Sequence, residues 1–329
     1  NAVYKSVDGT LYSKDGRMLI VYPAGKTDKA FTIPDSVTEI YEGAFAHCEN
    51  LTTVVIPDNV INIYRYAFYN CTGLIDIRLP SSITRISDST FAKCTSLTNI
   101  VIPEGVTSIE EWAFSWCTNL NSVTLPTTLK FIYDWAFNSC VRLYEVVNNS
   151  SLLIACGSSD YGYIGYYAIE IHGGESSIVN QNGYLFYSCD GRSYLIGYVG
   201  RETKLALPDD CNGEKYEIVD YAFYDNSEIT ELVIPDFVTS IGDYAFYGMY
   251  AVKEIAFCNT ITSIGKCAFA FCVNLKSIEL PSSVTTIGES AFEGCGALET
   301  VTLPESVTEI GERVFAYDHK LTTVKAVEG

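Results

Sequence analysis

The chain has 329 residues, of which 48% are hydrophobic and 19% are charged, a composition that suits a folded chain with a large core and excludes a disordered one. Its 21 Lys and Arg against 40 Asp and Glu leave a formal charge of −19, which argues against nucleic acid and anionic membranes as partners because both need clustered positive charge. No apolar run approaches the roughly 20 residues that span a bilayer, so no membrane insertion is expected in this segment.

The chain opens with a predicted β-hairpin module. Residues 8–34 contain two apolar, Tyr-rich runs separated by Asp-Gly, a dipeptide typical of tight hairpin turns. Residues 182–208 resemble them, and each hairpin leads into a run of repeats. The chain begins at Asn1 with no secretory signal, so we expect the sorting signal and any anchor to lie outside this segment.

A 23-residue unit follows each hairpin five times. It reads L-x-x-V-x-I-P-x-x-V-x-x-I-x-x-x-A-F-x-x-C-x-x, and residues 51–73 show it whole. Nine of the 10 Pro and ten of the 16 Phe fall on its Pro and Phe positions, a register that chance does not produce. The sequence therefore predicts three parts. They are a hairpin cap with five repeats (1–147), a connector with a short helix near 160–171 (148–177), and a second hairpin module with five repeats and a terminal half repeat (178–329).

Each repeat predicts two short extended runs and a tight turn. Val54 and Ile56 alternate with Thr53 and Val55, which is the period of a strand with one buried face. Proline ends this strand because it cannot donate into a ladder. A second extended run around Ile63 and a tight helical or 3-10 turn at the Ala-Phe pair complete the expected coil.

A single 23-residue coil cannot bury its own apolar side, so successive coils are expected to stack. Equivalent strands then lie about 4.8 Å apart in parallel sheets, and the Phe residues form a column. Four repeats of the second half carry Gly after the Ile, where the first half carries Tyr, Ser or Glu. We therefore expect ordinary φ values there, with Gly relieving crowding. These glycines are Gly242, Gly265, Gly288 and Gly311.

The repeat resembles the BspA-type leucine-rich repeat, which is also found in treponemal surface proteins. The resemblance covers nearly the whole chain outside the connector and is specific, because Pro, Ala-Phe and Cys recur in fixed register. It implies a right-handed leucine-rich-repeat solenoid with a curved parallel sheet, and a bacterial surface or secreted protein of the kind discussed as adhesins for host matrix proteins. It supplies no ligand motif, so no binding residue is carried over.

No residue pattern predicts catalysis, a metal site or a cofactor. Of the 12 Cys, seven fall on the Cys position of the repeat, where we expect buried thiols that act as small hydrophobes. No Cys and His spacing matches a zinc site. His47 and His319 lie in the first and last repeats and His172 lies in the connector, so a Ser/His/Asp or Cys/His arrangement is not expected.

Aromatic residues are the most informative surface signal. All three Trp lie in adjacent repeats, and Trp112 and Trp135 share the position before the Ala-Phe pair, as does Tyr66. Stacking would place Trp112 and Trp135 side by side on an edge of the solenoid, and Trp116 is a further candidate. Trp and Tyr are favoured at protein interfaces and at sugar-facing platforms alike. The alternative is a lateral ladder that only covers apolar stems.

The outward sheet residues form the second candidate surface. Val55, Arg78 and Val101 occupy the same outward position in three successive repeats. Such residues change from repeat to repeat while the core positions stay fixed, and solenoids commonly bind on a continuous sheet face. An unconstrained solvent surface would vary in the same way.

These patterns predict a non-catalytic, extracellular or cell-surface binding scaffold whose partner is a host extracellular-matrix or cell-surface protein. A carbohydrate-binding module for host or dietary glycans is the alternative, and a spacer that holds another domain away from a cell wall is the third possibility. Aromatic platforms flanked by Asp, Asn and Arg would favour sugar, whereas a flat mixed face with apolar spots such as Val55 and Val101 would favour protein.

Overall fold

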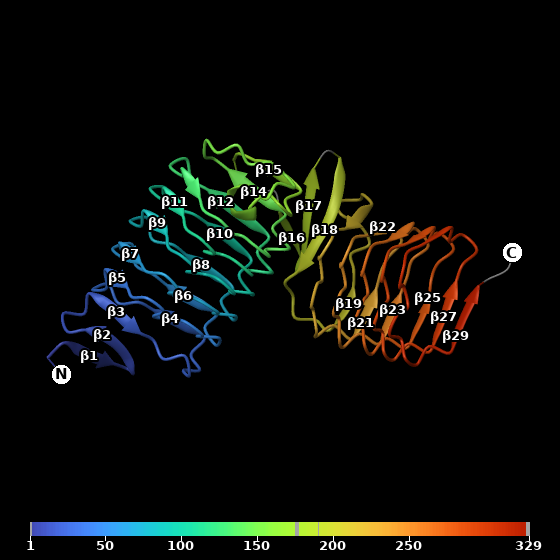
Figure 1. The fold of residues 1–329 in the computed structure, drawn as a ribbon, viewed down its shortest axis with the longest axis horizontal. Helices are drawn as coiled ribbons and strands as arrows, with labels where there is room; N and C mark the ends of the chain where they lie inside the picture. The colour runs from blue at the N-terminus through green and yellow to red at the C-terminus, as the bar shows by residue number, and fades with distance from the viewer. Residues whose placement is uncertain (1, 175–177, 190, 327–329) are drawn as a thin grey trace. The chain divides into compact units, whose positions relative to one another are not determined.

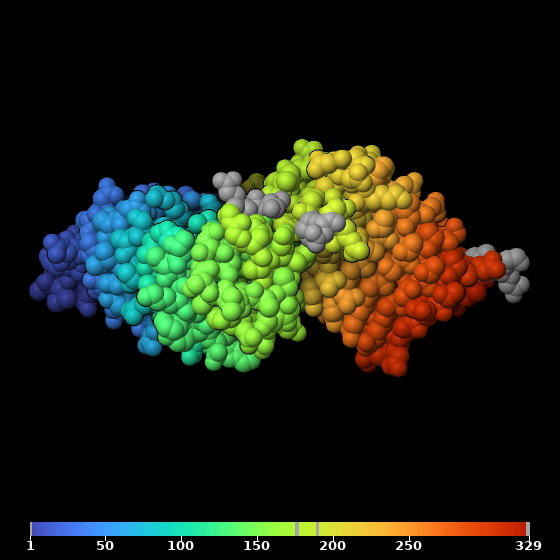
Figure 2. All heavy atoms as spheres, turned by 90° about the horizontal axis from the view of Figure 1, so that it is seen from above, coloured from blue at the N-terminus to red at the C-terminus, as the bar shows by residue number. Residues whose placement is uncertain are grey.

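The computed structural model describes residues 2–174, 178–189 and 191–326 (Figure 1). The chain divides into two compact units, Asn1–Ser176 (unit 1) and Ser177–Gly329 (unit 2). In each unit short parallel strands stack coil upon coil, which confirms the predicted solenoid. Side chains fill the space between successive coils within each unit (Figure 2).

Unit 1 begins with an antiparallel meander and continues with two rows of short parallel strands. The meander is β1 (Tyr4–Val7), β2 (Thr10–Ser13) and β3 (Met18–Val21). The first row is β4 (Ala30–Thr32), β6 (Thr53–Val55), β8 (Asp76–Arg78), β10 (Asn99–Val101), β12 (Ser122–Leu125), β14 (Glu145–Asn148) and β15 (Glu170–His172). The second row is β5 (Glu39–Ile40), β7 (Asn62–Ile63), β9 (Arg85–Ile86), β11 (Ser108–Ile109) and β13 (Phe131–Ile132). Hydrogen bonding is interrupted between β8 and β10 and between β7 and β9, that is, on either side of the third repeat.

Unit 2 also begins with an antiparallel meander and continues with two rows of short parallel strands. Its antiparallel meander is β16 (Val179–Gln181), β17 (Tyr184–Cys189) and β18 (Arg192–Tyr198). One row is β19 (Lys204–Ala206), β21 (Glu231–Val233), β23 (Glu254–Ala256), β25 (Ser277–Glu279), β27 (Thr300–Leu303) and β29 (Thr323–Ala326). The other is β20 (Tyr216–Ile218), β22 (Val238–Ile241), β24 (Ser263–Ile264), β26 (Thr286–Ile287) and β28 (Glu309–Ile310). This second row runs unbroken from the meander to β28.

Strand pairing follows the register of the sequence repeat. Val54 on β6 pairs with Ile77 on β8, the equivalent residue of the next repeat. Val54 is buried while its neighbours Thr53 and Val55 are exposed, as expected for a strand with one face on the core. The period of two in the sequence therefore identified the core-facing side of the strand correctly.

A column of stacked Phe rings runs through the core of each unit. The rings of Phe68 and Phe91 have centroids 5.4 Å apart and planes 5° apart, which confirms the stacked-coil prediction. Similar contacts link the rings from Phe45 to Phe137 in unit 1 and from Phe223 to Phe315 in unit 2. Each coil is therefore stabilised mainly by apolar contact with its neighbours.

A column of thiols lies beside the Phe column. Cys94 Sγ donates to the carbonyl of Phe68 (3.2 Å), and Cys117 Sγ donates to that of Phe91 (3.2 Å). Burial raises the pKa of Cys94 to about 12, so the neutral thiol is the stable form. The eleven cysteines whose side chains the structure describes are free, and those on the repeat position are buried as predicted.

The turn at the Ala-Phe pair differs from the predicted helical or 3-10 turn. Residues 64–71 form a series of hydrogen-bonded turns, such as the bond from Tyr69 N to Tyr66 O (3.0 Å). Tyr66 and Asn70 have φ values of 58° and 56°. A left-handed residue cannot continue a right-handed helix, so these two residues prevent a helix from forming in the turn.

The connector also contains less helix than predicted over 160–171. A 3-10 helix, η1, covers only Tyr161–Tyr163, and Asp160 at its start makes no capping bond through its side chain. The carbonyl of Gly162 accepts a hydrogen bond from Phe137 N (2.8 Å), which is the bond that a further repeat would supply. In the described part of the chain no helix is long and apolar enough to cross a membrane.

Candidate functional site

Two left-handed residues in every repeat shape the turn edge of each unit. One precedes the Ala-Phe pair, and the other precedes the Cys position. The first set is Gly43, Tyr66, Ser89, Trp112, Trp135, Tyr221, Tyr244, Cys267, Ser290 and Arg313. The second set is His47, Asn70, Lys93, Trp116, Ser139, Asp225, Gly248, Phe271, Gly294 and Tyr317. Except in the last repeat of each unit, their backbone amides bond to the next coil, as Trp116 N does to Asn138 O (2.8 Å), and such bonds offset the roughly 1–2 kcal/mol that this conformation costs.

The structure brings two of the predicted Trp residues together. The rings of Trp112 and Trp135 are stacked with centroids 5.4 Å apart and planes 8° apart. Tyr163 of η1 stacks on the other side of Trp135 at 5.1 Å. Trp112 and Trp135 are 38% and 41% exposed, so this three-ring stack presents its edges to solvent.

The other aromatic candidates lie on the same edge without joining the stack. Trp116 is 51% exposed and occupies the second left-handed position of its turn. Tyr66 lies two repeats before Trp112, and Ser89 stands at the equivalent position between them. Tyr66 instead packs against Tyr69 of its own turn, with ring centroids 5.8 Å apart. Tyr66 is therefore separate from the Trp stack.

The sheet-face candidates form a row across three first-row strands. Val55 on β6 pairs with Arg78 on β8, and Val101 follows on β10. Val55 and Val101 are 52% and 62% exposed, which is high for apolar side chains. Arg78 is held by an ion pair with Asp58 (3.1 Å), so a guanidinium with a fixed position stands between two apolar spots.

Unit 2 carries a tyrosine counterpart that was not singled out from the sequence as a site. Tyr221 and Tyr244 stack at 5.1 Å, and Tyr224 and Tyr247 stack beside them at 5.0 Å. These side chains are half-buried. The available signal was Tyr at two positions three residues apart in successive repeats. Each unit therefore has its own aromatic turn edge.

One polar cluster was also missed, because its members are far apart in sequence. Glu145 on β14 is fully buried; it accepts from Ser122 Oγ (2.7 Å) and contacts His172 Nε2 (3.2 Å) on β15. The carboxylate lies between the hydroxyl and the imidazole. A nucleophilic triad needs the imidazole between the other two groups, so this geometry does not activate Ser122. Its effect is to tie β15 to β14.

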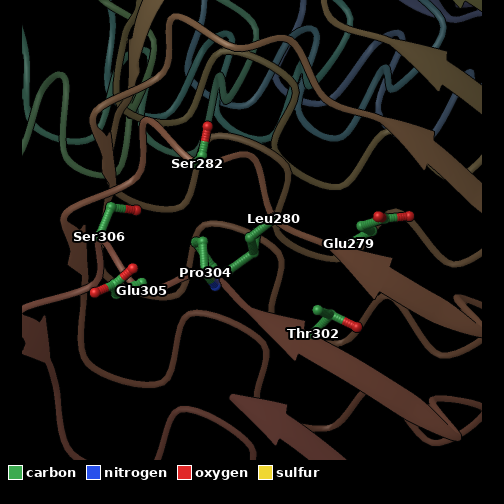
Figure 3. A pocket seen from close by; sticks show the side chains of 7 residues that line it. All are labelled: Glu279, Leu280, Ser282, Thr302, Pro304, Glu305 and Ser306. Carbon is green, nitrogen blue, oxygen red and sulfur yellow. The ribbon is translucent and has the colours of Figure 1, made fainter. Parts of the chain in front are cut away.

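An open recess lies at the ends of β25 and β27 in unit 2 (Figure 3). Its volume is about 600 Å³, and Leu280 and Pro304 form its floor. The carboxylates of Glu279 and Glu305 are exposed at its rim. Across residues 2–174, 178–189 and 191–326, no group of three or more His, Cys, Asp or Glu is placed to hold a metal ion.

Stacked 23-residue coils with parallel strands, an apolar column and variable turn edges define a leucine-rich-repeat solenoid. The chain belongs to the BspA-type leucine-rich repeat family, whose profile matches residues 25–154 and 216–328 in 6 copies. Comparison with the curated proteins gave no match.

Several solved structures resemble the chain. A leucine rich cell surface protein from Faecalibacterium prausnitzii is 24% identical over 100% of this chain and 96% of that chain, with a TM-score of 0.49. The leucine-rich repeat protein TpLRR of T. pallidum is 30% identical over 44% of this chain and 70% of its own, with a TM-score of 0.43. The pneumococcal vaccine antigen PcpA is 19% identical over 99% of this chain and 88% of its own, with a TM-score of 0.43.

Proposed function

We propose that this chain is a non-catalytic scaffold that binds a protein of the host matrix or host cell surface, and that it acts outside the bacterial cell in adhesion. The exposed stack of Trp112, Trp135 and Tyr163 is the observation that carries the proposal. Trp and Tyr dominate the energetics of protein interfaces, and Trp side chains half exposed in one cluster are rare on a surface with no partner.

Ring geometry favours a protein over a sugar at this edge. A sugar ring packs on the flat face of an aromatic side chain, but Trp112 and Trp135 each cover one face of the other at 5.4 Å, and Tyr163 covers the second face of Trp135, so the second face of Trp112 is the one Trp face of this stack without a ring on it. The ring edges carry partial positive charge and the indole N–H donors. Backbone carbonyls and aromatic side chains of a protein fit such edges best.

The charge beside the Trp stack indicates which kind of protein surface would bind there. Exposed carboxylates precede both stacked Trp residues, Glu111 before Trp112 and Asp134 before Trp135. A partner surface that carries Lys or Arg would therefore complement the edge, and binding should weaken with added salt. The row of Val55, Arg78 and Val101 offers a second contact region on the sheet face.

Membership of the BspA-type family supports the proposed location, because this family implies bacterial surface and secreted proteins. The formal charge of −19 keeps such a chain soluble and disfavours direct contact with anionic lipid.

The test is binding of the whole chain to a panel of purified matrix and host cell-surface proteins. Trp135→Ala and Trp116→Ala should each weaken a genuine hit by about 10-fold or more, as expected for interface anchors. Tyr317→Ala, which removes an exposed aromatic side chain at the repeat position of Trp116 but in unit 2, is the matched control for Trp116→Ala and should have no effect. The proposal fails if no protein binds, or if the Trp variants bind every hit as the parent does.

A further inference from the structure

The third repeat of unit 1 lacks the large side chains that the second repeat carries after its Ile. Residues 87–90 read Ser-Asp-Ser-Thr, whereas residues 64–67 read Tyr-Arg-Tyr-Ala. The Ser87 hydroxyl donates to the carbonyl of Ile63 (2.6 Å), a place that a backbone amide takes in the neighbouring repeats. The hydrogen-bonded row is interrupted at the same point, between β7 and β9. The third repeat is thus a local exception in the stack.

The short side chains leave a hollow of about 280 Å³ at the carboxyl ends of the second-row strands. Ser87 at its base is 8% exposed. The volume is just below the range of about 300–1,000 Å³ that suits drug-sized ligands, so the hollow has room for one small ring. Its walls include Tyr64, Arg65, Arg85, Asp88 and Glu110.

The walls offer both hydrogen-bond donors and an unsatisfied acceptor. Asp88 is half-buried, and its Oδ1 has no hydrogen-bond partner within the chain, so the carboxylate has acceptor capacity that the protein itself does not use. Arg85 is exposed and forms no ion pair with any described residue, so its guanidinium is available as a donor. Arg65 is positioned by an ion pair with Glu42 (3.0 Å).

From this set of groups we infer that the hollow is a binding subsite for a single sugar ring of a glycan. An anionic ligand would face the carboxylates of Glu42, Asp88 and Glu110, and a cationic ligand would face the guanidinium groups of Arg65 and Arg85. A neutral ring with adjacent hydroxyls avoids both conflicts, because each hydroxyl can donate to Asp88 and accept from Arg85. Tyr64, whose hydroxyl donates to Glu39 (2.9 Å), adds an aromatic wall that is held in place.

The recess of Figure 3 differs from the hollow in the side chains that line it. That recess is larger, but Glu279, Glu305 and the hydroxyls at its rim are joined by no guanidinium and no aromatic side chain. It therefore lacks the combination of cationic donors and aromatic wall that sugar recognition uses. Its residues supply a matched control for the hollow.

The experiment is a glycan array of host and plant glycans probed with the whole chain, followed by calorimetry with the best free oligosaccharide. Ser87→Tyr fills the hollow with the side chain that the second repeat already carries, and it should weaken binding at least 10-fold. Asp88→Asn and Arg85→Gln each remove one charge and leave the hollow open, and they should each weaken binding several-fold. Ser282→Tyr in the Figure 3 recess and Trp135→Ala should leave glycan binding unchanged, so this result is separable from that for the Trp edge.

The inference is overturned if no glycan binds the chain, or if a bound glycan is held equally well by Ser87→Tyr, Asp88→Asn and Arg85→Gln. It is also overturned if the three hollow variants lose a protein ligand while no glycan binds the chain. Thermal unfolding followed by Trp fluorescence checks that Ser87→Tyr is folded. If it is not folded, glycan binding by Asp88→Asn and Arg85→Gln decides whether the inference holds.

Discussion

Units 1 and 2 share their core but differ in the turn that follows the second strand. In unit 2 this turn has Gly265 and its equivalents, and a Cβ atom on Gly265 would lie 2.6 Å from the backbone nitrogen of Asp243. None of Gly242, Gly265, Gly288 and Gly311 has positive φ, which confirms that Gly relieves crowding there. In unit 1 the same position holds Tyr41 and Tyr64, which contact each other at 6.2 Å.

The difference shows that one apolar column supports two kinds of turn. In unit 2 the backbone of successive turns packs closely, and Asp243 Oδ1 accepts from the Lys266 amide of the next turn (2.6 Å). In unit 1 the same position holds Tyr, Ser or Glu. Only unit 1 therefore displays large side chains, or a hollow, directly after the Ile.

The shared column predicts the largest and most equal effects. Phe91→Ala in unit 1 and Phe269→Ala in unit 2 should each lower the free energy of unfolding of their own unit by about 3–5 kcal/mol, because each leaves a cavity in a close-packed stack. Trp fluorescence reports unit 1, which contains all three Trp, and circular dichroism reports both units. Phe131→Ala, at an exposed ring, should cost less than about 0.5 kcal/mol. Equal loss at Phe131 would contradict a special role for the column.

Substitutions in the turn after the second strand should affect the stability of the two units differently. Gly265→Ala should destabilise unit 2 by about 1–3 kcal/mol, since the new methyl group meets backbone atoms that cannot move independently. Tyr133→Ala at the equivalent position of unit 1 should be nearly neutral because that side chain is exposed. Denaturant unfolding of both variants tests the comparison, and a neutral Gly265→Ala would show that the two turns are interchangeable.

Asp318 occupies the Cys position in the last repeat of unit 2, next to Cys295 of the preceding repeat. Burial raises the pKa of Asp318 to about 7 from 3.8 and outweighs the opposing effect of the neighbouring backbone amides of Cys295 and Gly294. The folded state favours the neutral acid, so this contribution to stability is full below pH 3.8 and is lost as the pH rises through about 7. Asp318→Cys should add about 1 kcal/mol at pH 8, since a thiol can donate where the carboxylate cannot, and it should flatten the pH profile. Asp318→Asn is the control that removes charge without restoring the column.

The smallest expected effect concerns β15 in unit 1. Desolvation alone would lower the pKa of His172, but hydrogen bonds to the Gly173 carbonyl and the Glu145 carboxylate outweigh it and raise the pKa above 6.5. The pair therefore stabilises unit 1 fully below about pH 6.5, and this contribution is lost as the pH rises through the raised pKa. Melting temperatures of His172→Gln should show a weaker dependence on pH between 6 and 8 than the parent.

The repeat register predicted what depends on burial. Val54, Phe68 and Cys94 lie where the pattern placed them, because apolar side chains of stacked coils have one solution that excludes water. The contact between Trp112 and Trp135 followed from the same register. The site residues themselves remain proposals, since exposure shows where a partner could bind and not which partner does.

The turn and the polar clusters were less predictable for physical reasons. Left-handed φ at Tyr66 or Trp112 depends on hydrogen bonds to the next coil and has no local signal such as Gly. The hollow beside Ser87 arises because neighbours 23 residues away are larger, and the contact of Glu145 with His172 joins segments whose distance is set by the connector. Such features depend on the whole stack rather than on any one repeat.

The left-handed turn positions also limit how this scaffold can change. The twenty residues that occupy them across ten repeats include no Val, Ile, Thr or Pro, the residue types for which this backbone conformation is least accessible. They include Trp, Tyr, Phe, Arg and Asn, several of which contribute most strongly to recognition. The residue types that the fold tolerates at these positions are therefore enriched in those that form contacts with partners. New specificity can arise by substitution there without altering the core.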